Sequence, residues 1–180
     1  MSFTSPSPSK QNKDGKGGAW TCQLYFDYNA DGPGTGNYYT DPELKMKLKD
    51  YIGENEVIVR VSYFTHPLYG TQLSSVFLHH AFVVFKTEHW WWSIEKNSEG
   101  ITIQRAKKIK NVRDKYRQER RTVYWWKPFS TPTLVKETPG KQKTIREVIQ
   151  FLWAKDFLHR EYHWLLSNCQ RFAGAFWGRC

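Results

Sequence analysis

The chain has 180 residues, of which 39% are hydrophobic and 17% aromatic, a size and composition that suit one globular domain with large side chains in its core. Its formal net charge of +10 attracts nucleic acid, anionic lipid or an acidic protein, and the sign alone does not choose among them. No apolar run approaches the roughly 18 residues that span a bilayer, and the N-terminus lacks a signal-peptide core, so we expect a cytoplasmic protein without a transmembrane segment.

The first 18 residues are rich in Ser, Pro, Lys and Gly and contain almost nothing to bury. Such a segment cannot offset the entropy of its own ordering, so we expect a disordered basic tail at 1–18 and a single globular domain at 19–180. The domain opens with a strand-like stretch at 20–28 and a turn at 31–36. A short helix then runs from its cap Asp41 to about Tyr51. We expect this front section to pack as a cap on the core.

Strand patterns follow in the next part of the chain. Hydrophobic and polar residues alternate at 56–64, and further strands are expected at 75–85, 90–96 and 101–104. The four polar residues 86–89 are short enough to form a hairpin loop.

The hairpin has a chemical consequence. If the loop is symmetric, His80 lies opposite Glu95, and directly opposed residues of an antiparallel pair project from the same face. A carboxylate then lies beside a candidate base. A slip by one residue would send Glu95 to the other face.

A basic segment comes next, because nine of the residues in Arg105–Arg121 are Lys or Arg and only two are acidic. Most of it, 108–120, is predicted as a helix with little apolar stripe. A strand at 122–126 and a loop at 128–140 follow. Thr144 and Glu147 match a capping box, which predicts a helix to about Lys155 with one apolar face.

The last predicted helix begins at the end of a short lead-in segment, 162–166. Asn168 is a strong N-cap residue, and the helix that it opens is apolar at Phe172, Ala173, Phe176 and Trp177. Cys169 therefore lies in the first turn, where unpaired backbone amides and the positive end of the helix dipole favour a thiolate.

The other two cysteines are not expected to be catalytic. Cys22 lies in an apolar strand without an obvious base, and Cys180 is the last residue, so both are expected to be structural or incidental. An odd number of cysteines without CxxC or His-rich spacing favours reduced thiols and suggests no zinc site, and no motif calls for a cofactor.

Thiol chemistry needs a nucleophile, a base, a group that orients the base and amides directed at the developing oxyanion. We assign these roles to Cys169, to His80, to Glu95 and to the backbone N–H of Cys169. Because His79 and His80 are adjacent in a strand, alternation leaves the choice of base between them open. Of the remaining histidines, His66 is expected in a loop and His89 in the hairpin turn, while His159 and His163 fall close to Cys169 in sequence.

These motifs resemble the circularly permuted papain-like fold of the NlpC-type superfamily. In its lecithin:retinol acyltransferase-like and PPPDE thiol-peptidase branches the histidine precedes the cysteine, as His80 precedes Cys169. The base there lies on a strand of the type His-x-Ala-hydrophobic-hydrophobic, to which 80–85 is similar, and this favours His80 over His79. The segment 168–172 resembles the Asn-Cys-x-x-Phe motif of the peptidase branch. Gln170 and Arg171 depart from the Glu-His pair of the acyltransferase branch.

The resemblance implies an α+β fold in which an antiparallel sheet packs against helices, with the cysteine at a helix N-terminus. It also implies a cysteine hydrolase or acyl transferase that acts on a peptide, isopeptide or acyl ester bond. The second family histidine has no counterpart on the strand after the hairpin, where Glu95 is the substitute and Ser93 and Asn97 are the next candidates. No hydrophobic C-terminal anchor is present, which weakens an assignment to membrane lipids.

A competing interpretation comes from the charge. In it the chain is a non-catalytic module that binds nucleic acid or anionic lipid through Arg105–Arg121, and Cys169 is merely packed. No RNP, KH or zinc-finger pattern accompanies the basic segment. A third interpretation joins the two, with the basic face recruiting the enzyme to an acidic partner.

Overall fold

The structure is a computed structural model, and it describes residues 24–32, 35–51, 56–67, 79–97, 100–113, 131–160, 162 and 168–180. The predicted tail 1–18, the predicted strand 122–126, Cys22 and His163 lie outside the described residues. So do 75–78 of the strand expected at 75–85 and 114–120 of the expected basic helix.

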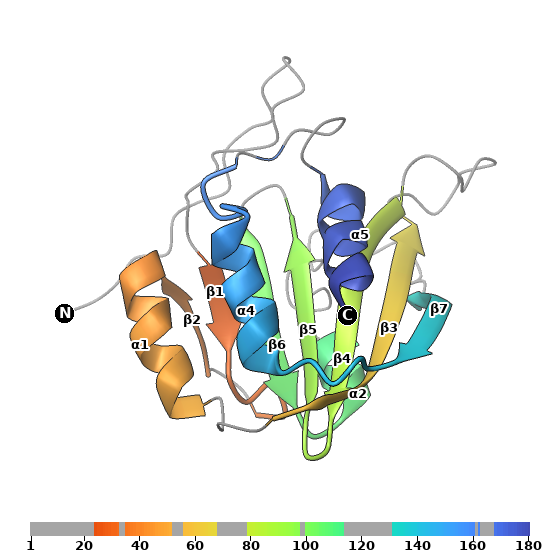
Figure 1. The fold of residues 1–180 in the computed structure, drawn as a ribbon, viewed down its shortest axis with the longest axis horizontal. Coiled ribbons are helices and arrows are strands. Elements are labelled where there is room, and N and C mark those ends of the chain that lie inside the picture. The colour runs from red at the N-terminus through yellow and green to blue at the C-terminus, as the bar shows by residue number, and fades with distance from the viewer. Residues whose placement is uncertain are drawn as a thin grey trace, which may run out of the picture.

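Seven strands form one sheet in the order β2-β1-β6-β5-β4-β3-β7 (Figure 1). Their bounds are β1 Leu24–Asp27, β2 Gly36–Tyr39, β3 Ile58–Pro67, β4 His79–Thr87, β5 Trp91–Lys96, β6 Ile101–Ala106 and β7 Thr133–Pro139. Five neighbouring pairs are antiparallel, but β1 and β6 are parallel, so the expected wholly antiparallel sheet is wrong at this pair. Distant segments of the chain meet there, and a parallel pair requires such a long connection. The fold is a mixed α+β arrangement.

Helices cover both faces of this sheet. On one face lie α1 Asp41–Tyr51, α4 Ile145–Ala154 and α5 Cys169–Arg179, and their apolar residues join one large buried cluster with the inward side chains of the strands (Figure 1). The short α2 Ile109–Arg113 belongs to a smaller cluster on the opposite face, with Phe82 and Val84 of β4. Successive residues of β4 therefore alternate between the two cores.

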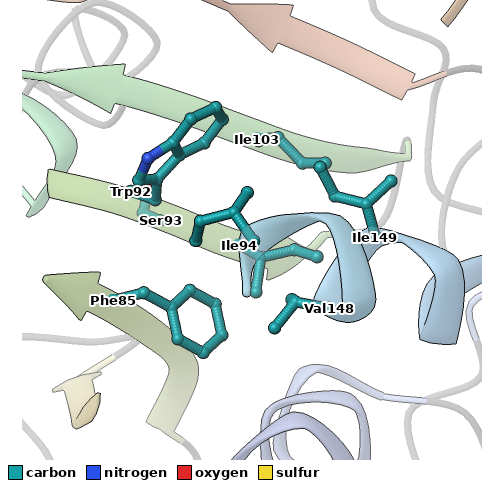
Figure 2. Close-up of a pocket in the computed structure, with 8 residues that line it drawn as sticks. Phe85, Trp92, Ser93, Ile94, Ile103, Val148 and Ile149 are labelled. Carbon is teal, nitrogen blue, oxygen red and sulfur yellow. The ribbon is translucent and has the colours of Figure 1, made fainter. Parts of the chain in front are cut away.

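Helix α4 packs on the centre of the sheet. Figure 2 shows Val148 and Ile149 of α4 facing Phe85, Ile94 and side chains of the adjoining strands across a small apolar pocket. The predicted apolar face of this helix is confirmed, since Ile145, Val148, Ile149 and Leu152 are buried. Such a largely apolar lining belongs to the hydrophobic core.

The N-terminal helix begins close to its predicted start. Its first helical residue is Asp41, and the carbonyl of Thr40 accepts the hydrogen bond from the N–H of Leu44. The Glu43 carboxylate accepts from both the backbone N–H and the hydroxyl of Thr40. Thr40 is therefore the cap, one residue before the predicted Asp41. The front section does not simply cover the core, because β1 and β2 extend the sheet.

The prediction of a loop at 128–140 is wrong in the part that the structure describes, 131–140. Residues Thr133–Pro139 form β7, which pairs antiparallel with β3 at an edge of the sheet. Most of its side chains are exposed, so the strand carries no alternating hydrophobic signal. Backbone pairing holds it instead, including a hydrogen bond from the N–H of Gly140 to the carbonyl of Val59.

The β4–β5 hairpin forms with a different register from the predicted one. The N–H of Thr87 donates to the carbonyl of Trp90, so the loop has two residues instead of four, and Val84 pairs with Ser93 where a symmetric 86–89 loop would place Trp91. His80 is consequently not directly opposite Glu95. Because side chains alternate with a period of two, a shift of two residues keeps Glu95 on the face of His80.

The capping box of α4 is confirmed, and it gives a test of the fold. The Thr144 hydroxyl accepts from the Glu147 N–H at 3.2 Å, and Glu147 accepts from the Thr144 N–H at 2.9 Å. Thr144→Ala removes the acceptor and is expected to lower the free energy of unfolding by about 1 kcal/mol in urea titrations. Thr144→Ser keeps an oxygen at the cap and should retain most of that stability. Equal losses in the two variants would contradict this role of the cap.

Candidate active site

The candidate nucleophile is placed by the start of α5, as predicted. The helix begins at Cys169, and the Asn168 side chain accepts a hydrogen bond from the N–H of Arg171 at 3.0 Å. Phe172, Ala173 and Phe176 are buried, which fixes the helix on the sheet. Cys169 is itself buried, with a reduced thiol that is only 3% exposed.

The sulfur lies where β4 and β5 separate. Their paired positions run from Lys86–Trp91 to Val83–Ile94, and the first residues of β4 continue beyond this ladder. The first turn of α5 meets the backbone there (Figure 1). Cys169 Sγ lies 3.8 Å from the carbonyl oxygen of His79, and Gln170 Nε2 donates to the same oxygen at 3.2 Å. The N–H of Ala81 donates to the sulfur.

His80 and Glu95 are in direct contact. Nε2 of His80 lies 2.7 Å from Oε2 of Glu95, and both side chains are buried. Alternation along β4 directs His80 to the same side as Phe82, whose ring lies next to its imidazole. Because Glu95 occupies Nε2, Nδ1 is the ring nitrogen left for the sulfur.

The electrostatics favour a thiolate beside an imidazolium. Burial alone would raise the pKa of Cys169, but the hydrogen bond and positive charge of His80, the Ala81 N–H and the Tyr162 hydroxyl together lower it below its usual value. Burial alone would lower the pKa of His80, but hydrogen bonds to Cys169 and Glu95 and the negative charges of both raise it to about 9. At neutral pH each group therefore stabilises the charged form of the other.

Two side chains at this site were not predicted. Tyr162, in the lead-in segment, places its hydroxyl oxygen 4.0 Å from Cys169 Sγ. Gln170 ties the first turn of α5 to β4. Neither belongs to a recognisable spacing, because both act through contacts with distant or irregular parts of the chain.

The other histidines that the structure describes have different surroundings. His79 contributes its carbonyl oxygen to the site. His66, expected in a loop, is instead buried on β3 opposite His80, so that prediction is wrong; the extra strand length comes from pairing with β4. His89 is exposed in the hairpin turn as predicted, and His159 is exposed and contacts Asp156.

The remaining candidates serve the core. Cys180 is buried, and burial raises its pKa to about 11, so its thiol is less acidic than usual. Arg105 is also buried: its guanidinium lies over the rings of Trp90 and Trp92, and it donates to the carbonyl of Tyr28. This residue therefore does not belong to an open basic face. Binding of a partner by the rest of Arg105–Arg121 stays a prediction.

Two further findings concern the described residues alone. No group of three or more His, Cys, Asp or Glu side chains among them could hold a metal ion. In the same part of the chain, every helix is too short or too polar to cross a membrane.

Comparison with known proteins adds an independent observation. The family model described as the PPPDE putative peptidase domain matches residues 43–179, which include most of α1, all of α5 and all the residues of the site described above. Searches of curated proteins and of solved structures found no match. A match to this domain suggests a cysteine-type peptidase or hydrolase activity. Because the match covers most of the sequence, the chain belongs to the PPPDE putative peptidase family.

Proposed function

We propose that this protein is a cysteine hydrolase in which Cys169 attacks the carbonyl carbon of a peptide or isopeptide bond. The observation that supports it most directly is the continuous contact from Glu95 through His80 to the sulfur, all within the buried opening between β4 and β5. A packed structural cysteine needs no such partners, because an apolar environment satisfies it. The order of His80 before Cys169 fits the permuted papain-like arrangement, which is part of this proposal.

The residues divide the reaction as follows. The thiolate of Cys169 forms a bond to the carbonyl carbon while the C=O π electrons move to oxygen. The intermediate collapses, the C–N bond breaks, and the imidazolium of His80 gives its proton to the leaving amine. Neutral His80 then takes a proton from the water that attacks the thioester, and collapse releases a carboxylic acid and the thiolate. Glu95 holds the ring and stabilises its positive form.

An ester carbonyl would pass through the same thioester, and an acceptor other than water would make the reaction an acyl transfer. The family match supports the peptide bond over these two. The binding-module interpretation gains nothing from Arg105, which is buried and whose guanidinium lies over two indole rings.

Thiol reactivity tests the assignment of the nucleophile. Iodoacetamide should alkylate Cys169 at pH 6 to 7, where ordinary thiols are protonated, because His80 lowers the pKa of its thiol. Cys169→Ala should abolish this labelling, measured by intact-protein mass spectrometry, whereas Cys22→Ala and Cys180→Ala should retain it. His80→Asn should slow the labelling of Cys169 at neutral pH, and the labelling rate should recover as a rising pH ionises the thiol.

Two results would count against the proposal. One is undiminished labelling of Cys169→Ala at pH 6 to 7, since the reactive thiol would then be another cysteine. The other is a His80→Asn variant with the pH profile of the native protein, since the sulfur would then owe nothing to the imidazole.

The role of Glu95 can be tested by titration of His80. Its hydrogen bond and negative charge help to raise the pKa of the imidazole to about 9. Glu95→Gln keeps a polar side chain of the same size but removes the charge, so the pKa of His80 should fall toward 6.5. In this variant the imidazolium should therefore lose its proton at a lower pH than in the native protein. NMR of histidine ring carbons measures both values, and Glu88→Gln, an exposed change on the same hairpin, is the matched control.

A further inference from the structure

Tyr162 carries a half-buried phenol that the catalytic roles assigned above do not use. Its hydroxyl forms a long hydrogen bond to the sulfur, 4.0 Å from Oη to Sγ. The same oxygen accepts a hydrogen bond from the backbone N–H of Cys169. The phenol thus touches both the nucleophilic atom and the amide at the helix start.

That position has a chemical meaning. When a carbonyl carbon bonds to Sγ, its oxygen becomes negative within reach of the Cys169 N–H and needs hydrogen-bond donors around it. In the free protein the Tyr162 oxygen accepts from this same amide, so it lies at the edge of the space that the oxyanion would fill.

We propose that the Tyr162 hydroxyl is the second donor of the oxyanion hole, with the backbone N–H of Cys169 as the first. This inference rests on the proposed hydrolase function and names a residue for its transition state. As the thiolate bonds to carbon and the π electrons move to oxygen, the substrate oxygen replaces the Tyr162 oxygen as the acceptor of the hydrogen bond from the Cys169 N–H. The phenol then turns its O–H from the sulfur, whose negative charge has been lost, to the new oxyanion. No proton leaves Tyr162 at any point.

The phenol is suited to remain a donor. Burial and the negative charge of Cys169 raise the pKa of Tyr162 well above its usual value, so the hydroxyl stays protonated throughout the range in which the thiolate forms. Its backbone is tethered nearby, because the Lys96 ammonium, buried at the end of β5, donates to the carbonyl of Arg160 two residues earlier.

Two reactions of the same sulfur separate this role from a structural one. Acylation by p-nitrophenyl acetate passes through an oxyanion, whereas alkylation by iodoacetamide is a displacement that forms none. Tyr162→Phe should slow acylation about 10²- to 10³-fold, the usual effect of losing one oxyanion donor. Alkylation, measured at a pH where the thiol is fully ionised, should keep the native rate. The Cys169→Ala protein gives the background of non-specific acetylation.

Tyr63→Phe is the matched control. Burial and the charge of Cys169 also raise the pKa of Tyr63, but its ring packs against Trp177 and Lys136. Removing its hydroxyl should leave both rates unchanged.

The outcomes are distinguishable. A Tyr162→Phe variant that loses acylation and keeps alkylation supports the inference. Equal rates of acylation in native and Tyr162→Phe proteins overturn it and leave the hydrolase proposal intact. A parallel loss of both reactions also overturns it, because Tyr162 would then only position the sulfur. If the native protein is alkylated at Cys169 but never acylated there, the proposed function fails, and this inference fails with it.

Discussion

The geometry of the site depends on where the β4–β5 ladder stops. Beyond Val83 and Ile94 the two strands separate, so backbone groups at the start of β4 need other partners, because buried polar groups are costly when unpaired. The first turn of α5 supplies them: Gln170 donates to the carbonyl of His79, and the sulfur of Cys169 accepts from Ala81. The requirement to satisfy this backbone therefore places the thiol in the opening of the sheet.

The same opening brings the two faces of the sheet together. Helix α5 packs with the large core on one face, whereas His80 and Glu95 follow the alternation of Phe82 and Ser93 toward the other. An intact ladder would separate a sulfur and an imidazole placed in this way. Burial of three ionisable groups is expensive in isolation. The order of carboxylate, imidazolium and thiolate places each charge next to its opposite, and this compensates much of that expense.

Local signals in the sequence predicted the parts of the site that local physics determines. Asn168 and the Thr144–Glu147 box mark helix starts because caps act within one turn, and the face of Glu95 follows from a period of two that survives the change in register. Long-range pairing determines the rest. The edge strand β7, the parallel β1–β6 pair, His66 opposite His80 and the approach of Tyr162 to the sulfur each depend on partners distant in the sequence or on irregular backbone.

The site is held by elements whose stability does not come from it. The contacts of α4 with the sheet are apolar (Figure 2), and the aromatic residues of α5 pack among themselves and against Phe157. A framework of this kind can hold a desolvated thiolate and imidazolium in fixed positions, so the proposed reaction, in which charge moves from sulfur to a carbonyl oxygen, would need little reorganisation. The hydrogen-bond donors that would face the oxyanion are those already directed at the thiolate. For this reason a phenol that donates to the sulfur before reaction is well placed to donate to the oxyanion during it.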